Sequence, residues 1–167
     1  MRPHIHRFDS FPGGCFFRFC GFFLVLVLLG SACSGIRSYP RFSLDQKHLR
    51  MQRVIESYLD TPYLWGGENK NGIDCSGLVV VVFRQALGIS LPHSTEALFN
   101  MGHGVGSGKV RYGDLVFFSE GGGSPTHVGI GLGGGRFVHA SLERGVVISS
   151  LGTSYFRERF IGARRLQ

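Results

Sequence analysis

Three residues, Cys75, His127 and His139, are of the types that carry out nucleophilic catalysis by a thiol. A histidine beside a cysteine can accept the thiol proton and later return it to a leaving amine, and a second histidine can orient the first. Two other interpretations stay open, because a lone cysteine is often an inert core residue, and one cysteine with two histidines could bind zinc. No Cys-x-x-Cys or His-x-x-x-His pair supports the zinc site.

Cys75 stands where a helix would begin. Asp74 precedes it and can cap a helix that runs from Cys75 to Gly88. The body of this segment, 78–83, is apolar on every side, which suits a central helix, although its β-branched residues would also suit a buried strand. The free N–H groups at a helix N-terminus stabilise an anion, so we expect the pKa of the Cys75 thiol to be lowered.

The segment 126–132 alternates like a strand whose two faces differ. Apolar side chains occupy one face, and His127 shares the other face with Gly129 and Gly131. We interpret the glycine face as room for the helix that carries Cys75 to pack closely beside His127.

A run of three glycines, 133–135, separates this strand from a second one that contains His139. If all three glycines form the turn, Leu132 pairs with Arg136, and the two histidines share a face as diagonal neighbours, about 7–8 Å apart at the backbone. His139 could then bond the far nitrogen of the His127 ring and fix its tautomer. A two-residue turn would instead place the histidines on opposite faces and separate them.

The hydrophobic pattern changes period half-way along the chain. Helical spacing predicts helices over 43–60, 75–88 and 94–102. Alternation between glycine-rich turns then predicts strands over 114–119, 126–132, 136–141, 145–150 and 160–165. This order indicates an α+β fold, with N-terminal helices packed on an antiparallel sheet of about five strands. His93 and His103 fall in loops and are assigned no role, and Trp65 is expected to pack in the core or a loop.

The first 32 residues have the layout of a signal peptide. The apolar stretch 19–32 follows Arg2, Arg7 and Arg18 and ends in small residues. It is shorter than the roughly 20 residues that a membrane-spanning helix needs. We therefore expect an exported protein, with the spanning anchor as the weaker interpretation.

Cys33 follows this stretch in a context that resembles the lipobox of bacterial lipoproteins, in which the cysteine is diacylated and becomes the new N-terminus. The resemblance implies a signal peptide over 1–32, a lipidated tether over 33–42 and a domain over 43–167. Ser34 is associated with sorting to the outer membrane, so we expect the protein to be lipid-anchored at the periplasmic face of that membrane. Ordinary cleavage near Ala32, giving a soluble secreted protein, is the alternative.

This processing would leave Cys75 as the one unmodified cysteine, because Cys15 and Cys20 leave with the signal peptide. In an oxidising compartment an unpaired thiol is a hazard unless it is buried or used. The composition, with 43% hydrophobic and 17% charged residues, fits one packed domain, which we expect to be a monomer. The net charge of +7 suits an anionic polymer or a membrane, and no basic helix or zinc-finger spacing predicts a nucleic-acid partner.

Five segments of the sequence carry a resemblance to a known family. They are 61–67 (TPYLWGG), 74–78 (DCSGL), 113–118 (GDLVFF), 127–130 (HVGI) and 137–141 (FVHAS). In this order they resemble the motif series of the NlpC family of papain-like cell-wall cysteine peptidases, and the resemblance covers about residues 45 to 165.

The resemblance implies a role for each matching residue. Cys75 would be the nucleophile, His127 the base and acid, His139 the orienting residue, and Tyr63 a hydroxyl donor to the oxyanion. Asp74 and Ser76 would lie at the substrate end of the groove, and neither a metal nor a cofactor is implied. One position departs from the family pattern, because His93 stands where an arginine is common.

The resemblance also implies a reaction, the hydrolysis of peptide bonds in peptidoglycan stem peptides through a thioacyl intermediate. The bond would be the one between γ-D-glutamate and diaminopimelate, which we slightly prefer, or the D,D cross-link. Two other functions use the same fold: a non-catalytic lipoprotein that binds the cell wall, and a Cys-His acyltransferase or amidase with another substrate.

Overall fold

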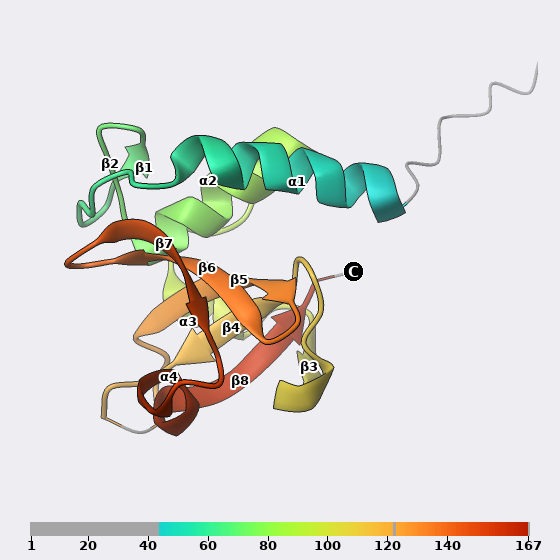
Figure 1. The fold of residues 1–167 in the computed structure, drawn as a ribbon, viewed down its shortest axis with the longest axis vertical. Helices are drawn as coiled ribbons and strands as arrows, with labels where there is room; N and C mark the ends of the chain where they lie inside the picture. The colour runs from blue at the N-terminus through green and yellow to red at the C-terminus, as the bar shows by residue number, and fades with distance from the viewer. Residues whose placement is uncertain (1–43, 122, 167) are drawn as a thin grey trace, which may run out of the picture. The chain divides into compact units, whose positions relative to one another are not determined.

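The computed structural model describes residues 44–121 and 123–166, which form helices and a sheet (Figure 1). The predictions for the signal peptide 1–32, for Cys33 and for the tether 33–42 lie outside these residues. Within them, no helix is both long and apolar enough to cross a membrane.

Two helices form the N-terminal layer. α1 (Leu44–Tyr58) buries Met51, Ile55 and Tyr58, which are spaced at three and four residues along one face. α2 (Cys75–Leu87) begins at Asp74, whose side chain accepts a hydrogen bond from the Gly77 N–H, and it ends at Gly88, which has a left-handed φ of 69°. The helix predicted here is confirmed, and the alternative strand is wrong.

Two further helices are short. α3 (Thr95–Phe99) is capped by Ser94, as predicted, but it ends before Gly102, where the prediction had placed its end. α4 (Ser154–Arg159) was not predicted, because it is only six residues long and carries no clear apolar period. A 3-10 turn (Ser107–Lys109) precedes the first long strand of the sheet.

The main sheet is antiparallel and has six strands in the order β3-β8-β4-β5-β6-β7. All five predicted strands are present: β4 (Leu115–Phe118), β5 (His127–Gly133), β6 (Arg136–Ser141), β7 (Gly145–Ser150) and β8 (Phe160–Arg165). The sixth, β3 (His103–Val105), was missed because it is short and largely exposed. β1 (Glu68–Asn69) and β2 (Gly72–Ile73) form a separate small ladder beside α2.

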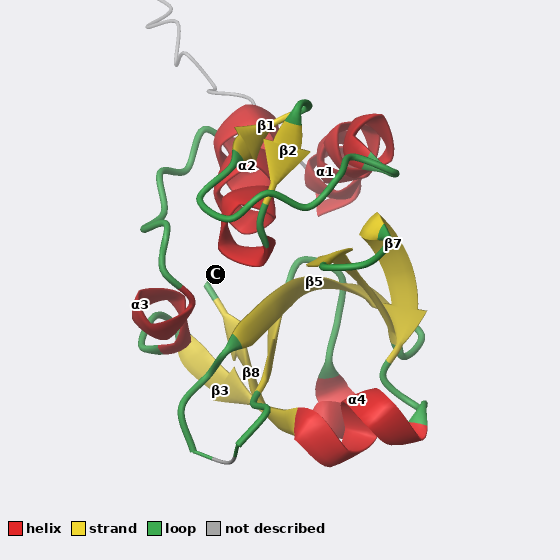
Figure 2. Ribbon diagram, turned by 90° about the vertical axis from the view of Figure 1, so that its left-hand side faces the viewer, coloured by secondary structure: helices red, strands yellow, loops and turns green. Residues whose placement is uncertain are grey.

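The sheet carries a core on each face. α1 and α2 lie over one face, and α4 lies against the opposite side (Figures 1 and 2). On the α2 side, Val128 and Ile130 are fully buried against Leu78 and Val82, and burying such a side chain stabilises a fold by roughly 1.5–3 kcal/mol. The second core is aromatic and includes Phe118, Phe137 and Phe156. α2 is thus fixed firmly over the middle of the sheet.

This arrangement corrects the interpretation of the glycine face. Val128 and Ile130 contact α2, so His127, Gly129 and Gly131 point to the opposite, aromatic face. A Cβ added at Gly129 would come within 2.7 Å of a ring carbon of Phe137 and of the Val138 carbonyl oxygen. The glycine therefore makes room for the neighbouring strand and its aromatic ring, and not for the helix that carries Cys75.

The hairpin between β5 and β6 differs from the prediction in its turn but not in its register at the histidines. Gly133 pairs with Arg136, so the turn has two residues, Gly134 and Gly135, and both have positive φ as a tight hairpin requires. A bulge at Leu132 inserts one extra residue, and beyond it Ile130 pairs with Val138. The bulge restores the register that a three-residue turn would have given.

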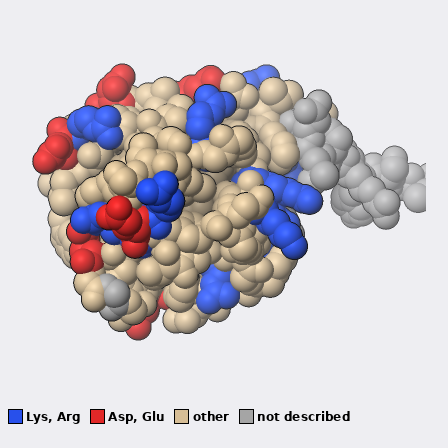
Figure 3. All heavy atoms as spheres, turned by 60° about the horizontal axis from the view of Figure 1, so that its bottom comes forward, with Lys and Arg blue, Asp and Glu red and all other residues tan. Residues whose placement is uncertain are grey.

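Charged side chains of both signs are mixed on the face of the protein that Figure 3 draws. On the face drawn in Figure 3, Lys and Arg side chains are spread widely, with Asp and Glu side chains among them on the left. No continuous basic strip crosses that face.

Candidate active site

Cys75 lies at the first turn of α2 and is 7% exposed. Its Sγ is 3.8 Å from the Thr95 hydroxyl oxygen. Burial raises the pKa of the thiol, and the charge of Asp74 raises it further. Hydrogen bonds from the Val128 backbone, Thr95 and the Ser76 backbone oppose this rise without outweighing it. The predicted lowering of the Cys75 pKa is therefore wrong, because desolvation exceeds the effect of the helix N-terminus.

His127 and His139 form the first link of a hydrogen-bonded chain. His127 Nε2 is 2.9 Å from His139 Nδ1, and His139 Nε2 is 3.0 Å from the Ser149 hydroxyl. If His127 Nε2 carries the hydrogen and donates it to His139, His127 Nδ1 is left free to accept a proton. His139 then donates from Nε2 to Ser149. The sequence did not indicate Ser149, because a serine at an alternating position of an edge strand looks like any other polar surface residue.

Aromatic rings enclose both imidazoles. The Phe137 ring stacks on His139 at 5.0 Å, and the Phe156 ring contacts it edge-on at 5.2 Å. Burial lowers the pKa of His127 to about 4, against a smaller opposing effect of Glu120. Burial, the neighbouring His127 and Arg144 lower the pKa of His139 to about 3. Both rings are therefore neutral near pH 7, when the Cys75 thiol is protonated.

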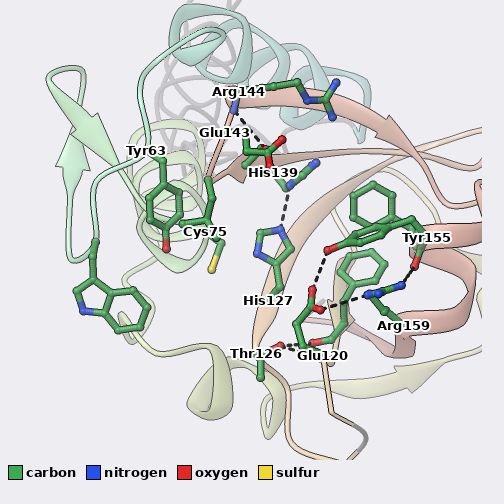
Figure 4. Close-up of a pocket in the computed structure, with 15 residues that line it drawn as sticks. Tyr63, Cys75, Glu120, Thr126, His127, His139, Glu143, Arg144, Tyr155 and Arg159 are labelled. Atoms are coloured by element: carbon green, nitrogen blue, oxygen red, sulfur yellow. Dashed lines mark hydrogen bonds and ion pairs between the residues drawn. The ribbon is translucent and has the colours of Figure 1, made fainter.

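These residues meet in one pocket of about 470 Å³, whose lining includes Tyr63, Trp65, Cys75, His127 and His139 (Figure 4). Cys75 and His127 form no hydrogen bond in the described part of the chain, and such catalytic bonds commonly tighten only in the substrate complex. A neutral imidazole beside a protonated thiol can act as a general base during attack. Within residues 44–121 and 123–166, no group of three or more His, Cys, Asp or Glu side chains could hold a metal ion.

Tyr63 lies beside Cys75 in this pocket (Figure 4). Burial raises the pKa of its hydroxyl, and the nearby charges of Cys75 and Asp74 raise it further. The hydroxyl thus stays protonated, and no described residue hydrogen-bonds to it, so it is available to donate to a substrate oxygen. Trp65 in the same loop is 87% exposed, so the expectation that it packs into the core or a loop is wrong.

Asp74 and Ser76 are buried and bonded to each other, with Ser76 Oγ donating to Asp74 Oδ1 at 3.0 Å. Neither is among the described residues that line the pocket, and their predicted contact with substrate stays a prediction. Burial alone would raise the pKa of the Asp74 carboxyl, but several hydrogen bonds outweigh it and lower that pKa. The donors are the Gly77 N–H, the His93 ring, the Gly66 N–H and the Ser76 hydroxyl.

His93 has a clear structural role, contrary to its assignment as a loop residue without one. Its Nε2 is 2.9 Å from Asp74 Oδ1, and its Nδ1 is 2.9 Å from Glu68 Oε1. The ring therefore links the cap of α2 to the small β1–β2 ladder. His103 lies exposed in β3, and no described side chain bonds to it.

The comparison with known families matches the segment that holds this pocket. The model of the NlpC/P60 family matches residues 60–165, a span that includes Tyr63, Cys75, His127 and His139. The chain belongs to the NlpC/P60 family. The resemblance predicted from the five motifs is confirmed.

Curated relatives of the family share much of the domain. The murein DD-endopeptidase MepS/murein LD-carboxypeptidase of Escherichia coli K12 is 44% identical over 117 residues, which cover 68% of this chain and 62% of that protein. The probable endopeptidase NlpC of the same strain is 35% identical over 154 residues, covering 89% and 99%. The gamma-DL-glutamyl hydrolase of Bacillus subtilis is 43% identical over 112 residues, covering 66% and 27%. This chain thus spans less than two thirds of two of these relatives.

Solved NlpC/P60 structures have the same fold. An NlpC/P60 family protein from Bacillus cereus superposes with a TM-score of 0.66 at 32% identity, covering 71% of this chain and 40% of that one. The peptidoglycan hydrolase RipB of Mycobacterium tuberculosis superposes with a TM-score of 0.63 at 29% identity, covering 77% and 68%. The predicted papain-like α+β fold of this NlpC/P60 chain is confirmed.

If Tyr63 donates to the oxyanion of a peptide substrate, as the resemblance implies, replacing it by phenylalanine is expected to lower kcat by about 10²–10³-fold, because that donor is lost. The thermal midpoint should hardly change, since the hydroxyl bonds to no described residue. Steady-state kinetics on a synthetic stem peptide would measure the effect. An unchanged kcat would show that Tyr63 does not contact the oxyanion.

Replacing His93 by alanine is expected to destabilise the domain by about 1–3 kcal/mol, because it removes a ring that bonds two carboxylates. Urea unfolding followed by circular dichroism would measure the loss. His103→Ala is the matched control, and it should change the free energy of unfolding by less than about 0.5 kcal/mol. Equal effects of the two substitutions would contradict the linking role of His93.

Proposed function

We propose that this chain is a peptidoglycan hydrolase, a cysteine endopeptidase that cuts stem peptides of the bacterial cell wall. One observation carries the proposal: Cys75, Tyr63 and the bonded pair His127–His139 line the same pocket. The names of the relatives support it, since they include a murein endopeptidase and a glutamyl hydrolase.

The reaction begins when His127 Nδ1 takes the proton of the Cys75 thiol as sulfur attacks the scissile carbonyl carbon. The carbonyl oxygen gains the negative charge, which the Tyr63 hydroxyl stabilises by donating a hydrogen bond. His127, now protonated, gives its proton to the leaving amine as the C–N bond breaks, and a thioester remains on Cys75. Water activated by His127 then hydrolyses the thioester and frees the thiol.

His139 and Ser149 hold the imidazole of His127 in the orientation that this sequence needs. With the His127 hydrogen on Nε2, His139 accepts at Nδ1 from His127 and donates from Nε2 to the Ser149 hydroxyl, so both hydrogen bonds run in the same direction. Because His139 stays neutral, it orients the base without competing for the proton.

We also propose that the protein acts outside the cytoplasm as a lipoprotein, with a signal peptide over 1–32, lipidation at Cys33 and a tether over 33–42. Such a leader would deliver the domain 43–167 to the compartment that holds its polymeric substrate. Labelling of cells with a radioactive fatty acid tests this, because Cys33→Ala should abolish the label.

Digestion of purified sacculi tests the proposed activity. The expected result is the release of muropeptides whose masses identify the bond cut, either between γ-D-glutamate and diaminopimelate or at the D,D cross-link. Release of no new fragment would contradict the proposal and leave a non-catalytic wall-binding protein. Acyl transfer to an acceptor outside the wall would favour the acyltransferase alternative instead.

A further inference from the structure

A cluster of three side chains, Glu120, Tyr155 and Arg159, lines the pocket beyond His127 (Figure 4). The Tyr155 hydroxyl donates to Glu120 Oε1 at 2.7 Å, and Arg159 Nε donates to Glu120 Oε2 at 3.3 Å. The Arg159 guanidinium also lies 4.0 Å from the centre of the Tyr155 ring. We call this set the α4 cluster, since two of its members come from that helix.

Backbone bonds fix the α4 cluster next to the catalytic base. The Glu120 N–H donates to the Thr126 hydroxyl at 3.2 Å, and Thr126 directly precedes His127 in the chain. The Ser119 N–H donates to the Arg159 carbonyl at 2.9 Å, which ties α4 to the end of β4. The backbone at Glu120 and Arg159 is therefore fixed beside His127, and the bonds among the three side chains set the geometry of the cluster.

The position of the cluster relative to His127 determines which part of a substrate it would meet. A general acid must lie within hydrogen-bond reach of the leaving nitrogen, so the leaving residue passes over His127. Figure 4 shows the α4 cluster on the side of His127 away from Cys75. Groups there face the leaving residue and not the acyl half, which lies on the side of Tyr63 and Trp65.

The cluster offers both signs of charge to that residue. The Glu120 side chain is 61% exposed and ionised, because hydrogen bonds from Tyr155 and then Arg159 lower its pKa. Arg159 is 31% exposed, and among the described residues its Nη2 has no hydrogen-bond partner. A carboxylate accepts more than two hydrogen bonds and a guanidinium donates five, so each group can still bind an opposite charge.

We propose that the α4 cluster binds the free ammonium and carboxylate at the D-centre of a diamino acid that leaves during cleavage. Arg159 donates to the carboxylate, and Glu120 accepts from the ammonium. This inference rests on the proposed function and deepens it. The inference favours cleavage of the bond between γ-D-glutamate and diaminopimelate. At a D,D cross-link the D-centre nitrogen belongs to the amide that is cut, so it is not a free ammonium.

Two synthetic tetrapeptides, L-Ala-γ-D-Glu-X-D-Ala, test the inference. In one, X is meso-diaminopimelate, and in the other it is L-lysine, which keeps the ammonium but lacks the carboxylate. For Arg159→Gln, kcat/KM on the diaminopimelate peptide is expected to fall about 10- to 100-fold, as for a lost charge-assisted bond. On the lysine peptide it should change by less than about threefold, which also shows that the variant is folded.

Arg157→Gln is the matched control, because Arg157 lies exposed on the same helix and does not line the pocket. It should alter neither peptide. Equal losses on both peptides for Arg159→Gln would overturn the inference, as would no loss on either, or cleavage confined to the D,D cross-link.

Calorimetric binding of the same peptides to the Cys75→Ala protein separates this inference from the proposed function. If the unsubstituted enzyme cuts no peptide, the proposed function fails. The inference is then decided by binding alone, through whether Arg159→Gln weakens binding of the diaminopimelate peptide specifically.

Discussion

Replacing Cys75 by alanine is expected to abolish the release of muropeptides from sacculi, with a loss of at least about 10⁴-fold in rate. No other thiol is available among the described residues, because Cys75 is the one cysteine there and it lines the pocket. Mass analysis of the released fragments measures the result.

The Cys75→Ala protein should remain folded, since alanine fits the buried first turn of α2 and the expected destabilisation is only about 1 kcal/mol. Thr95→Val is a matched control, because it removes the hydroxyl that lies 3.8 Å from the sulfur and leaves the thiol in place. It should reduce activity far less. Fragments that persist in the Cys75→Ala digest would show that a nucleophile other than Cys75 cleaves the peptide.

Acidification is expected to stop the enzyme only as the pH falls through about 4, where His127 becomes protonated and can no longer accept the thiol proton. The pKa of His127 is lowered because burial disfavours the cationic imidazole, so the ring stays a neutral base at any pH above that value. His127→Ala should lower kcat by about 10²–10⁴-fold, as for the loss of a general acid and base. A pH profile of kcat/KM on a soluble stem peptide, with kcat of the variant at pH 7, measures both effects.

An acid limb near pH 6.5 would contradict this account, because it would be that of a solvated histidine. Phe118→Leu offers a matched comparison, since it removes the aromatic ring that lies against His127 without removing a polar group. It should move the acid limb to higher pH. The same burial makes the free energy of unfolding sensitive to acid. Above pH 6.5 both histidines are neutral in the folded and unfolded states, and the free energy of unfolding then decreases as the pH falls toward the folded-state pKa values of about 4 and 3.

The elements that carry Cys75, His127 and His139 could be predicted because strong local signals mark them. Asp74 and Gly88 cap a segment that is apolar all round, and strict alternation marks the strands on both sides of the glycine turn. The family motifs then identified Tyr63, which no local pattern distinguishes. These features depend on neighbours close in sequence or on a shared motif.

The rest depends on contacts between distant segments. Glu120 and Arg159 are 39 residues apart, and α4 has too few residues for a readable period. The pKa of Cys75 was predicted in the wrong direction, because the helix N-terminus is visible in the sequence and the depth of burial is not. His93 was missed for the same reason, since its two carboxylate partners lie 19 and 25 positions before it.

The bulge at Leu132 gives the hairpin an unexpected vulnerability. Leu132 does not line the pocket, yet the number of residues between the turn and His127 decides which way His127 and His139 point. Removing a single residue from this stretch would turn one ring to the reverse side of the sheet, together with the apolar side chains on the same strand. The two histidines therefore stay on one face only if the number of residues inserted or deleted in this stretch is even. A change by an odd number would need a new bulge to compensate.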